Sequence, residues 1–357
     1  MKILLLYSYN QGYLSGFFTE VARLLAADGH AVTCFCLKGK RQRFTRDGVT
    51  FHIEKKGGYL NNYGRIYAVL KEVRPELVLS NFSYVNPALL FGRWFGVKQN
   101  MVWFHSLNEQ MEATRSNIAI KALFLRLAQR VIANSHLTAA QLEQVYGVAP
   151  EKCCVLPFWT PLAAQEVPAT ESPAYLQEGK LAIGCPGRMA VHKNQRVVLE
   201  AVSLLRQTEG RDFHVYFAGD GEEFLSLQAR VRELQLEDRV TFLKHLSAAD
   251  MEGFYKAMDV VVLPSLHEAF GLVFIEALSL GVPVLVSRRF GALTFIDSGA
   301  PLLEALTFAP ESAAELAEKL QPFRDRPGTD RQPYLELYRR TFSKKRIYEQ
   351  LTNCMGL

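Results

Sequence analysis

Short apolar segments alternate with stretches of helical periodicity along this chain, in two separate series. Segments rich in Val, Ile and Leu and bounded by turn residues are typical of buried strands. In the first series they begin at Ile3, Val32, Leu77, Met101 and Val131, and in the second at Leu181, His214, Val240, Val260 and Val282. Strands that alternate with helices form parallel sheets covered by helices on both faces. The sequence therefore predicts an α/β fold of two Rossmann-like domains.

A proline-rich interval over residues 157–179 separates the two series. Such an interval is typical of a linker, and 357 residues suit about two domains. We expect an N-terminal domain over residues 1–160, a linker over 161–179 and a second domain over 180–333. Residues 334–357 have helical periodicity and are predicted to form a C-terminal helix that either closes one domain or crosses back to the N-terminal domain. Tandem parallel sheets bind ligands at the carboxyl ends of their strands, so the expected site is a cleft between the domains.

Composition and cysteine spacing exclude several classes of protein. Hydrophobic residues make up 49% of the chain and charged residues 22%, which is a globular rather than a disordered composition. The apolar start of the chain stops at Ser8 without a cleavage site, so we interpret it as a strand rather than a signal peptide, and no window has the length of a membrane-spanning helix. The six cysteines show no CxxC spacing, which argues against a zinc site and against the disulfide framework of a secreted protein. A reducing cytoplasm fits best.

Positive charge is concentrated in the N-terminal half. Residues 1–160 carry 19 Lys and Arg against 10 Asp and Glu, whereas the remaining residues carry 22 against 26. The densest run, Lys38 to Arg46, either meets an anionic partner or forms a solvated loop. A helix expected over residues 117–130 carries Lys121, Arg126 and Arg130 among apolar residues, and it either lies at a membrane interface or packs as an ordinary helix.

Two segments of the second domain carry candidate chemistry. In the first, a strand ends at Gly187-Arg188, and Lys193-Asn194 precedes a helix, so two cations lie where a helix N-terminus already favours an anion. In the second, Glu268 follows a strand, Gly271 permits a tight turn, and Glu276 falls within the next helix. The pair of segments is suited to holding a diphosphate and the hydroxyl groups on either side of it.

These segments resemble the retaining GT-B glycosyltransferases of family 4, also called group 1 glycosyltransferases. The family's GR-x4-K segment appears as Gly187-Arg188 to Lys193, its G-D-G turn as Gly219-Asp220-Gly221, and its E-x7-E signature as Glu268 to Glu276, with Pro283 after it. A V-x-F-L segment runs from Val240 to His245. The resemblance implies a GT-B fold, in which two Rossmann-like domains face each other across a central cleft.

The N-terminal half is similar to the family more loosely. Gly12-Tyr13 stands where the family has two glycines, Gly29-His30-Ala-Val32 matches its G-H-x-V, His105 matches its histidine after an N-domain strand, and Asn134-Ser135 matches its N-S segment. Further departures are Leu156 to Trp159, where the family often reads P-N-G, and Thr294, where a glutamate is usual. His30 is interpreted as structural, and His192 and His267 are either solvated or in contact with the ligand.

Residue roles follow from this resemblance. Arg188 and Lys193 neutralise the leaving diphosphate, Glu276 binds the ribose, and Glu268 holds hydroxyl groups of the donor sugar. Backbone amides of Phe270, Gly271 and Leu272, together with Gly12 and His245, complete the donor site, and His105 reaches the sugar when the domains close. No DxD triplet occurs in the sequence, so neither a metal nor another cofactor is expected.

The function implied by the resemblance is retaining transfer of a sugar, most simply from a UDP-sugar, to a cell-surface glycan or glycolipid, as in lipopolysaccharide core or capsule synthesis. Contact of the basic N-domain with the anionic inner face of the cytoplasmic membrane fits this function.

One alternative is a non-catalytic protein that keeps the fold and binds glycan or a partner enzyme. An epimerase or phosphorylase fits the E-x7-E segment less well, and Glu109 and Glu112 are candidate bases if the enzyme inverts. The sequence has no G-x-G-x-x-G after its first strand, which argues against a nicotinamide-dependent oxidoreductase. It has no nucleic-acid-binding motif beyond its positive charge.

Overall fold

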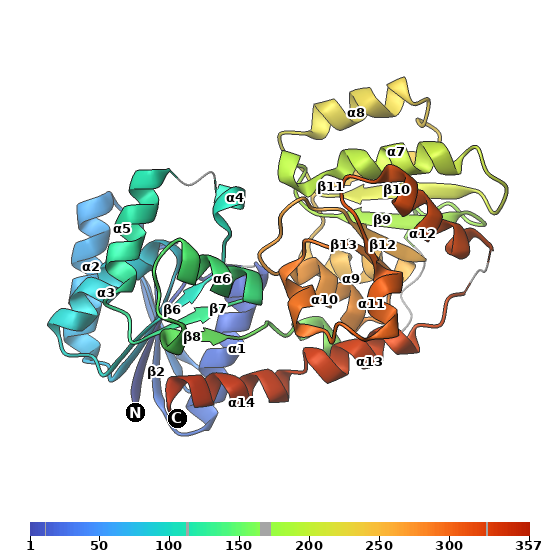
Figure 1. The fold of residues 1–357 in the computed structure, drawn as a ribbon. Helices are drawn as coiled ribbons and strands as arrows, with labels where there is room; N and C mark the ends of the chain where they lie inside the picture. The colour runs from blue at the N-terminus through green and yellow to red at the C-terminus, as the bar shows by residue number, and fades with distance from the viewer. Residues whose placement is uncertain (11, 112–113, 165–172, 326–327) are drawn as a thin grey trace. The chain divides into compact units, whose positions relative to one another are not determined.

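The computed structural model describes residues 1–10, 12–111, 114–164, 173–325 and 328–357 (Figure 1). They form two compact units: unit 1 comprises Met1–Trp159 and Lys344–Leu357, and unit 2 comprises Thr160–Ser343. Each unit is a largely parallel sheet with helices on both faces, so the predicted class of two Rossmann-like α/β domains is confirmed. Residues 165–172 of the expected linker lie outside the described residues, and the flanking Thr160–Ala164 and 173–179 belong to unit 2.

Unit 1 contains an eight-stranded sheet with the order β3-β4-β2-β1-β5-β6-β7-β8. Its strands are β1 (Lys2–Leu6), β2 (Ala31–Cys36), β3 (Gln42–Arg46), β4 (Val49–Ile53), β5 (Leu77–Asn81), β6 (Gln99–Phe104), β7 (Arg130–Ala133) and β8 (Cys153–Val155). Its helices are α1 (Tyr13–Ala27), α2 (Tyr59–Val73), α3 (Val85–Trp94), α4 (Asn108–Met111), α5 (Arg115–Leu125), α6 (His136–Gln144) and α14 (Lys344–Met355). All neighbouring strands are parallel except the β3–β4 pair.

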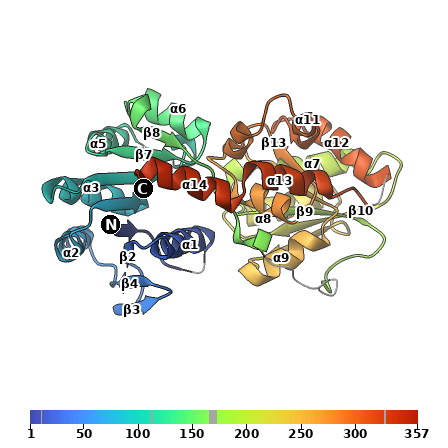
Figure 2. The same ribbon diagram turned by 90° about the horizontal axis from the view of Figure 1, so that it is seen from below.

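Alternation along β6 explains how this sheet is covered on both faces. Val102 and Phe104 point into a cluster with residues of α3, α5 and α6, whereas the intervening Trp103 packs edge-on against Phe17 and Phe18 of α1. Successive side chains of a strand point to opposite faces, so an uninterrupted apolar run serves both layers. Figure 2 shows α1 and α2 as separate layers beside the strands.

The second half of the basic run from Lys38 to Arg46, Gln42–Arg46, forms one strand of a hairpin, whereas residues 38–41 are irregular. β3 pairs antiparallel with β4 through Asp47 and Gly48, both of which have positive φ. An Asp-Gly pair between two strands is the typical signal of a two-residue hairpin turn. Within unit 1, Arg41 lies 3.1 Å from a carboxylate oxygen of Glu54, and Arg43 lies 2.5 Å from one of Glu72. Part of the positive charge of this run is therefore neutralised within the unit.

Unit 2 contains a six-stranded parallel sheet with the order β11-β10-β9-β12-β13-β14. Its strands are β9 (Leu181–Pro186), β10 (Phe213–Ala218), β11 (Val240–Lys244), β12 (Val260–Leu263), β13 (Val284–Ser287) and β14 (Thr307–Phe308). Its helices are α7 (Gln195–Leu205), α8 (Phe224–Glu233), α9 (Ala248–Ala257), α10 (Leu272–Ser279), α11 (Pro301–Leu306), α12 (Ala313–Asp325) and α13 (Gln332–Thr341).

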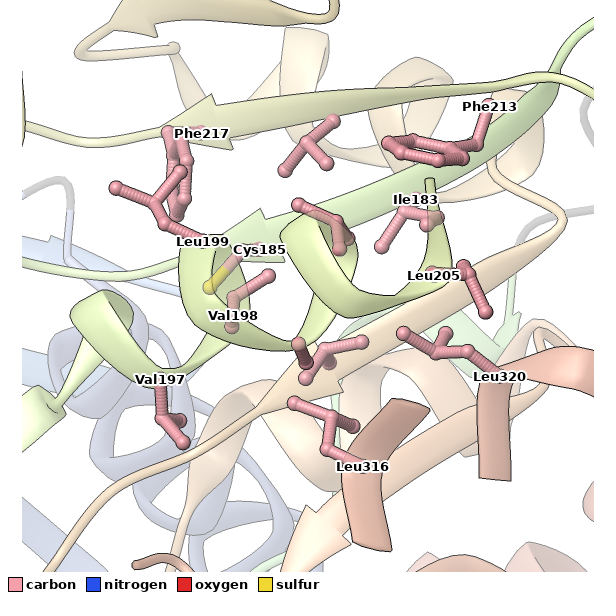
Figure 3. Close-up of a cluster of buried hydrophobic side chains, with 14 of the residues drawn as sticks. Ile183, Cys185, Val197, Val198, Leu199, Leu205, Phe213, Phe217, Leu316 and Leu320 are labelled. Atoms are coloured by element: carbon pink, nitrogen blue, oxygen red, sulfur yellow. The ribbon is translucent and has the colours of Figure 1, made fainter. Parts of the chain in front are cut away.

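The core of unit 2 lies between this sheet and helices α7, α8 and α12. Leu199 and Leu205 of α7 share one buried cluster with Ile183 and Phe217 of the sheet and with Leu320 of α12 (Figure 3). These side chains are almost fully buried, and each stabilises the unit by about 1.5 to 3 kcal/mol relative to an exposed position. This core fixes the positions of β9 and β10, and so also the points at which the loops after these two strands begin.

Two expected helices differ from the sequence prediction. Residues 334–357 were expected as one C-terminal helix, but they form the end of α13 in unit 2 and then α14 in unit 1, because the chain leaves the helical conformation around Ser343. The helix expected over residues 117–130 is α5, which ends at Leu125, and Arg130 instead begins β7. Among the described residues, no helix combines the length and apolar character that crossing a bilayer requires.

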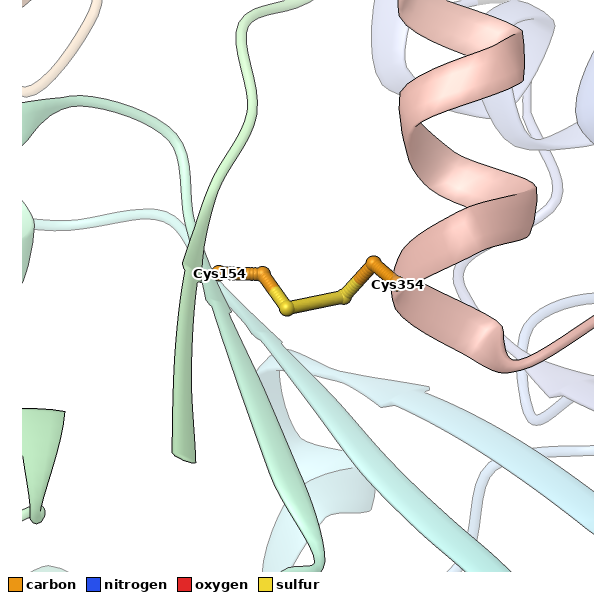
Figure 4. The surroundings of a disulfide bond; sticks show 2 residues. All are labelled: Cys154 and Cys354. Carbon is orange, nitrogen blue, oxygen red and sulfur yellow. A yellow bond between two sulfur atoms is a disulfide. The ribbon is translucent and has the colours of Figure 1, made fainter. Parts of the chain in front are cut away.

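A disulfide joins α14 to the sheet of unit 1. Cys154 of β8 is bonded to Cys354 of α14, and their Cα atoms lie 6.5 Å apart (Figure 4). The cysteine spacing argued against a disulfide framework, so the sequence did not predict this bond. The two residues are 200 positions apart, and such a separation leaves no local pattern. Four other cysteines are free thiols, at positions 34, 36, 153 and 185.

Reduction of this disulfide is expected to destabilise unit 1 by about 2 to 4 kcal/mol, because the bond restricts a long segment of the unfolded chain. The measurement is urea unfolding of the oxidised protein with and without dithiothreitol. Cys354→Ser should give the reduced midpoint under both conditions. If the urea midpoint of the wild type is the same with and without dithiothreitol, the prediction is contradicted.

Candidate functional site

Lys193 and Glu268 form an ion pair at the point where the strand order of unit 2 reverses. β9 leads to β10 on one side and neighbours β12 on the other, which is where open parallel sheets bind ligands. Lys193 follows β9 and Glu268 follows β12, and the Nζ atom of Lys193 lies 2.5 Å from Oε2 of Glu268. Glu268 is 9% exposed. The structure therefore brings together one cation and one carboxylate of the predicted donor site.

The G-D-G turn positions the loop that follows β9. A Cβ atom at Gly219 would lie 2.0 Å from the carbonyl oxygen of Gly187, and one at Gly221 would lie 2.2 Å from that of Met189. The Met189 amide donates to the carbonyl of Asp220 at 3.0 Å, which closes the contact between the two loops. Only glycine permits this approach, so these two positions fix the backbone that carries Arg188.

The loop that carries Glu268 is held by the segment after β13. The Glu268 amide donates to the carbonyl of Arg289, and the Gly291 amide donates back to the carbonyl of Glu268 at 2.9 Å. Gly271 ends the loop with φ +98° and precedes α10. Phe270 is buried against Phe295, and Leu272 opens the helix. The helix N-terminus formed there is the segment whose amides were predicted to face the donor phosphates.

Glu276 lies in α10 and accepts a hydrogen bond from Tyr255 of α9. The Tyr255 hydroxyl is 2.6 Å from Oε2 of Glu276. Burial raises the pKa of the Glu276 carboxyl, and the bond from Tyr255 opposes the rise. Tyr255 itself is fully buried, so it fixes the direction of the carboxylate.

Arg188 and His245 lie at the carboxyl ends of β9 and β11 and are exposed. Arg188 Nη2 donates to Oε2 of Glu222 at 2.9 Å, just before α8. Arg188 and Lys193 pair with different carboxylates, Glu222 and Glu268, and the bracket of two cations around a diphosphate stays a prediction. His192 and His267 flank the Lys193–Glu268 pair, and burial together with the Lys193 charge lowers the pKa of His192.

His105 directly follows β6 in unit 1, and its imidazole is neutral at neutral pH. Burial lowers its pKa to about 3. Nε2 of His105 lies 2.5 Å from Oδ1 of Asn81, and because that oxygen accepts, Nε2 carries the proton. Nδ1 is buried, and none of the described residues binds it. Asn134 donates to the His105 carbonyl at 3.2 Å, which gives the N-S segment a supporting role.

The depressed pKa of His105 predicts a loss of stability in acid. Between pH 6.5 and 3 the unfolded chain binds a proton at this residue that the folded unit does not, so stability falls as the pH falls. His105→Asn removes this contribution. From pH 7 to 4.5 the wild type should therefore lose about 2 kcal/mol more than the variant in urea unfolding. His136→Asn, at an exposed position, is the control and should follow the wild type, whereas parallel pH curves for wild type and His105→Asn would contradict the prediction.

Other predicted or candidate residues have local partners. The Gly12 amide donates to Oδ1 of Asn10 at 2.8 Å and Gly12 precedes α1. Tyr13, at the position of the family's second glycine, donates its hydroxyl to the carbonyl of Trp159. Glu109 accepts from Gln141 at 3.1 Å, and Glu112 lies outside the described residues.

The sequence did not indicate four residues that support the site: Asn81, Phe82, Glu222 and Tyr255. Asn81 and Phe82 follow a predicted strand, so the sequence indicated where they lie along the chain. It did not indicate that both contact His105. Glu222 and Tyr255 lie 34 and 21 residues from the side chains they bind, so only the tertiary structure pairs them.

Comparison with known families agrees with this arrangement. Residues 170–334 match the model of the glycosyl transferases group 1, and residues 16–160 match that of glycosyltransferase family 4. The chain belongs to the family 4 (group 1) glycosyltransferases. The resemblance found in the motifs is confirmed, and together the two matches span most of both units of this family member.

Individual relatives show the same family and fold. The 2-deoxystreptamine glucosyltransferase of Streptomyces kanamyceticus is 31% identical over 59% of this chain, and the O-antigen biosynthesis glycosyltransferase WclY of Escherichia coli is 32% identical over 36%. The match spans 55% of the first relative and 39% of the second. The structure of Anabaena Alr3699/HepE in complex with UDP and glucose superposes with a TM-score of 0.81, at 18% identity, over 100% of this chain and 99% of that one. This family member therefore has the GT-B fold.

Proposed function

We propose that this protein transfers a sugar, with retention of configuration, from a UDP-sugar to a hydroxyl group of a cell-surface glycan or glycolipid. The observation that carries the proposal is the Lys193–Glu268 ion pair at the reversal of strand order, in which Glu268 is buried and lies eight residues before Glu276. Support comes from the position of this pair after β9 and β12, because nucleotides bind at the carboxyl ends of strands in such folds, and from Glu276 in the helix that follows Glu268.

The proposed roles follow from charge. The acceptor hydroxyl oxygen forms a bond to the sugar C1 atom while the bond from C1 to the diphosphate oxygen breaks, and the electron pair leaves with UDP. Lys193 and Arg188 stabilise that negative charge, which is the part a metal ion plays in other transferases. Glu276 accepts from ribose hydroxyls, Glu268 accepts from the donor sugar, and Nδ1 of His105 accepts from a substrate hydroxyl. The acceptor proton is released in the net reaction.

Support for UDP as the nucleotide comes from the Anabaena structure, which holds UDP and glucose. Support for a lipopolysaccharide or capsule acceptor comes from the O-antigen enzyme of Escherichia coli. Exposed apolar side chains of unit 1 that have a basic neighbour in sequence further suit peripheral contact with an anionic membrane: Trp94 of α3 is 78% exposed next to exposed Arg93, and Leu123 of α5 is 62% exposed three residues before exposed Arg126. We therefore propose that the protein acts at the inner face of the cytoplasmic membrane.

Glu276→Gln is expected to weaken UDP binding about 10- to 100-fold, because hydrogen bonds to a charged acceptor contribute about 1.5 to 3 kcal/mol. Isothermal titration of UDP into both proteins measures the effect. Glu318→Gln, at an exposed position of α12, is the matched control and should bind UDP as the wild type does. Equal dissociation constants for wild type and Glu276→Gln would remove Glu276 from the donor site.

Sugar transfer itself is tested by proton NMR of UDP-glucose and UDP-galactose incubated with the protein. Consumption of one donor, with release of the α-anomer first, is expected for a retaining enzyme acting on water in place of its acceptor. First release of the β-anomer would overturn retention. UDP binding without consumption of either donor would instead favour a non-catalytic protein that keeps the fold.

A further inference from the structure

A cavity of about 410 Å³ lies within unit 1, next to His105. Its lining is mainly apolar and includes several aromatic rings, and the residues used in the argument are Tyr63, Phe82, Phe104, His105 and Lys121. The cavity is bordered by the loop after β5, the end of β6 and the inner faces of α2 and α5. A concave, mainly apolar site with a few polar groups is the usual form of a small-molecule site.

Lys121 is the one cation among the residues that line this cavity. Its ammonium group lies 5.1 Å from the centre of the Phe104 ring and 5.9 Å from that of Tyr146. Burial lowers its pKa. Among residues 1–111 and 114–164, apart from residue 11, no carboxylate lies within ion-pair distance of it. A partly desolvated ammonium beside two ring faces is costly unless a ligand supplies an anion.

Phe82 gives the cavity a flat wall beside the imidazole. Its ring stacks on His105 with centres 4.6 Å apart and an interplanar angle of 24°, yet Phe82 is 47% exposed. Its φ is +50°, a conformation that is rare for a bulky residue and that costs about 1 to 3 kcal/mol. Strain of this kind is found at binding sites, where it holds a side chain in a position that function needs. An aromatic face left open to solvent suits the apolar face of a sugar ring.

We propose that this cavity binds the acceptor and that Lys121 selects an acceptor sugar carrying a carboxylate or a phosphate, with the sugar ring against Phe82. This inference rests on the proposed function, because it names the acceptor class of that reaction. The anion pairs with the Lys121 ammonium, and the buried Nδ1 of His105 accepts from a hydroxyl of the same ring. A neutral sugar leaves the ammonium without a counter-charge, so it binds more weakly.

The experiment is a titration of the full chain with three probes, in which NMR measures each dissociation constant. The probes are methyl glucuronide as the carboxylate, glucose 6-phosphate as the phosphate, and methyl glucoside as the neutral sugar. The wild type should bind at least one anionic probe about tenfold or more tightly than methyl glucoside, and the tighter of the two identifies the anion. Lys121→Met should abolish this preference, and Lys121→Arg should retain it. Phe82→Ala should weaken all three probes alike.

Lys98→Met is the matched control, because Lys98 is an exposed lysine of the same unit that pairs with Glu76 at 3.4 Å. It should leave the preference unchanged. The inference is overturned if the anionic probes bind no better than methyl glucoside, or if Lys121→Met keeps the preference. UDP titrated into the same samples separates the two proposals: UDP binding without anion preference refutes this inference alone, and anion preference without UDP binding refutes UDP as the nucleotide of the donor while leaving the anionic sugar site in place.

Discussion

Lys193→Met is expected to lower kcat/KM for sugar transfer by about 10³-fold, since removal of one preorganised donor at a developing oxyanion costs about 2.7 to 4 kcal/mol. Lys193 is the cation that the structure places against Glu268, with an Nζ to Oε2 distance of 2.5 Å. Its loss removes positive charge from the leaving diphosphate and also removes the ion pair with the buried Glu268 carboxylate. The measurement is initial-rate kinetics with the donor that the protein consumes.

Loss of folding must be separated from loss of catalysis in this variant. Lys193→Met with Glu268→Gln removes both charges, so the double variant should regain thermal stability and stay inactive. Lys180→Met is the matched control, because Lys180 pairs with Asp212 at 3.5 Å in the same unit, and its activity should equal that of the wild type. If Lys193→Met keeps wild-type kcat/KM, Lys193 does not stabilise the leaving group.

Gly271→Ala is expected to destabilise unit 2 by about 3 to 5 kcal/mol. A Cβ atom at this position would lie 2.3 Å from Cδ1 of Phe290, and the φ of +98° is one that only glycine adopts without strain. Overlap in a packed region and backbone strain each cost about 1 to 3 kcal/mol, and here they act together. The measurement is the midpoint of urea unfolding of the full chain.

A second substitution separates the effect of the overlap with Phe290 from the effect of the backbone strain at Gly271. Gly271→Ala with Phe290→Ala removes the overlap and leaves the backbone strain, so it should be less destabilising than the sum of the two single variants. Gly253→Ala is the control, because a Cβ atom there has no neighbour within 4 Å in a helical segment. Wild-type stability of Gly271→Ala would show that the loop after β12 rearranges freely, which would contradict the rigid site described above.

Buried strands were the part of the fold most open to prediction. Segments such as Val260–Leu263 and Leu181–Pro186 are uninterrupted apolar runs, because both of their faces are covered. β3 was missed because most of its residues are charged or polar, and β4 was missed although apolar and polar residues alternate along it and Asp47-Gly48 is a clear hairpin signal. α2 was missed because only Ile66, Val69 and Leu70 are buried among its residues.

Within the candidate site, spacing predicted positions but not partners. Lys193 and Glu268 were both expected in the donor site, and the structure adds that they bind each other. Lys121 was expected on a helix at a membrane surface or in ordinary packing, whereas it lines a cavity, because the packing of Leu125 into the core sets the rotation of α5. Contacts between residues far apart in sequence, such as Tyr255 with Glu276, depend on tertiary structure and leave no local pattern.

The most direct test of the donor site is a thermal-shift measurement of the purified protein with UDP, GDP, ADP and CDP, in parallel with Glu276→Ala and Arg188→Ala. A ligand that binds only the folded state raises Tm, by an amount set by its concentration relative to Kd. The account predicts a rise with UDP that exceeds the rise with the other nucleotides and that both variants lose. No rise with any nucleotide, in protein that melts cooperatively, would contradict the donor site at Glu268 and Glu276.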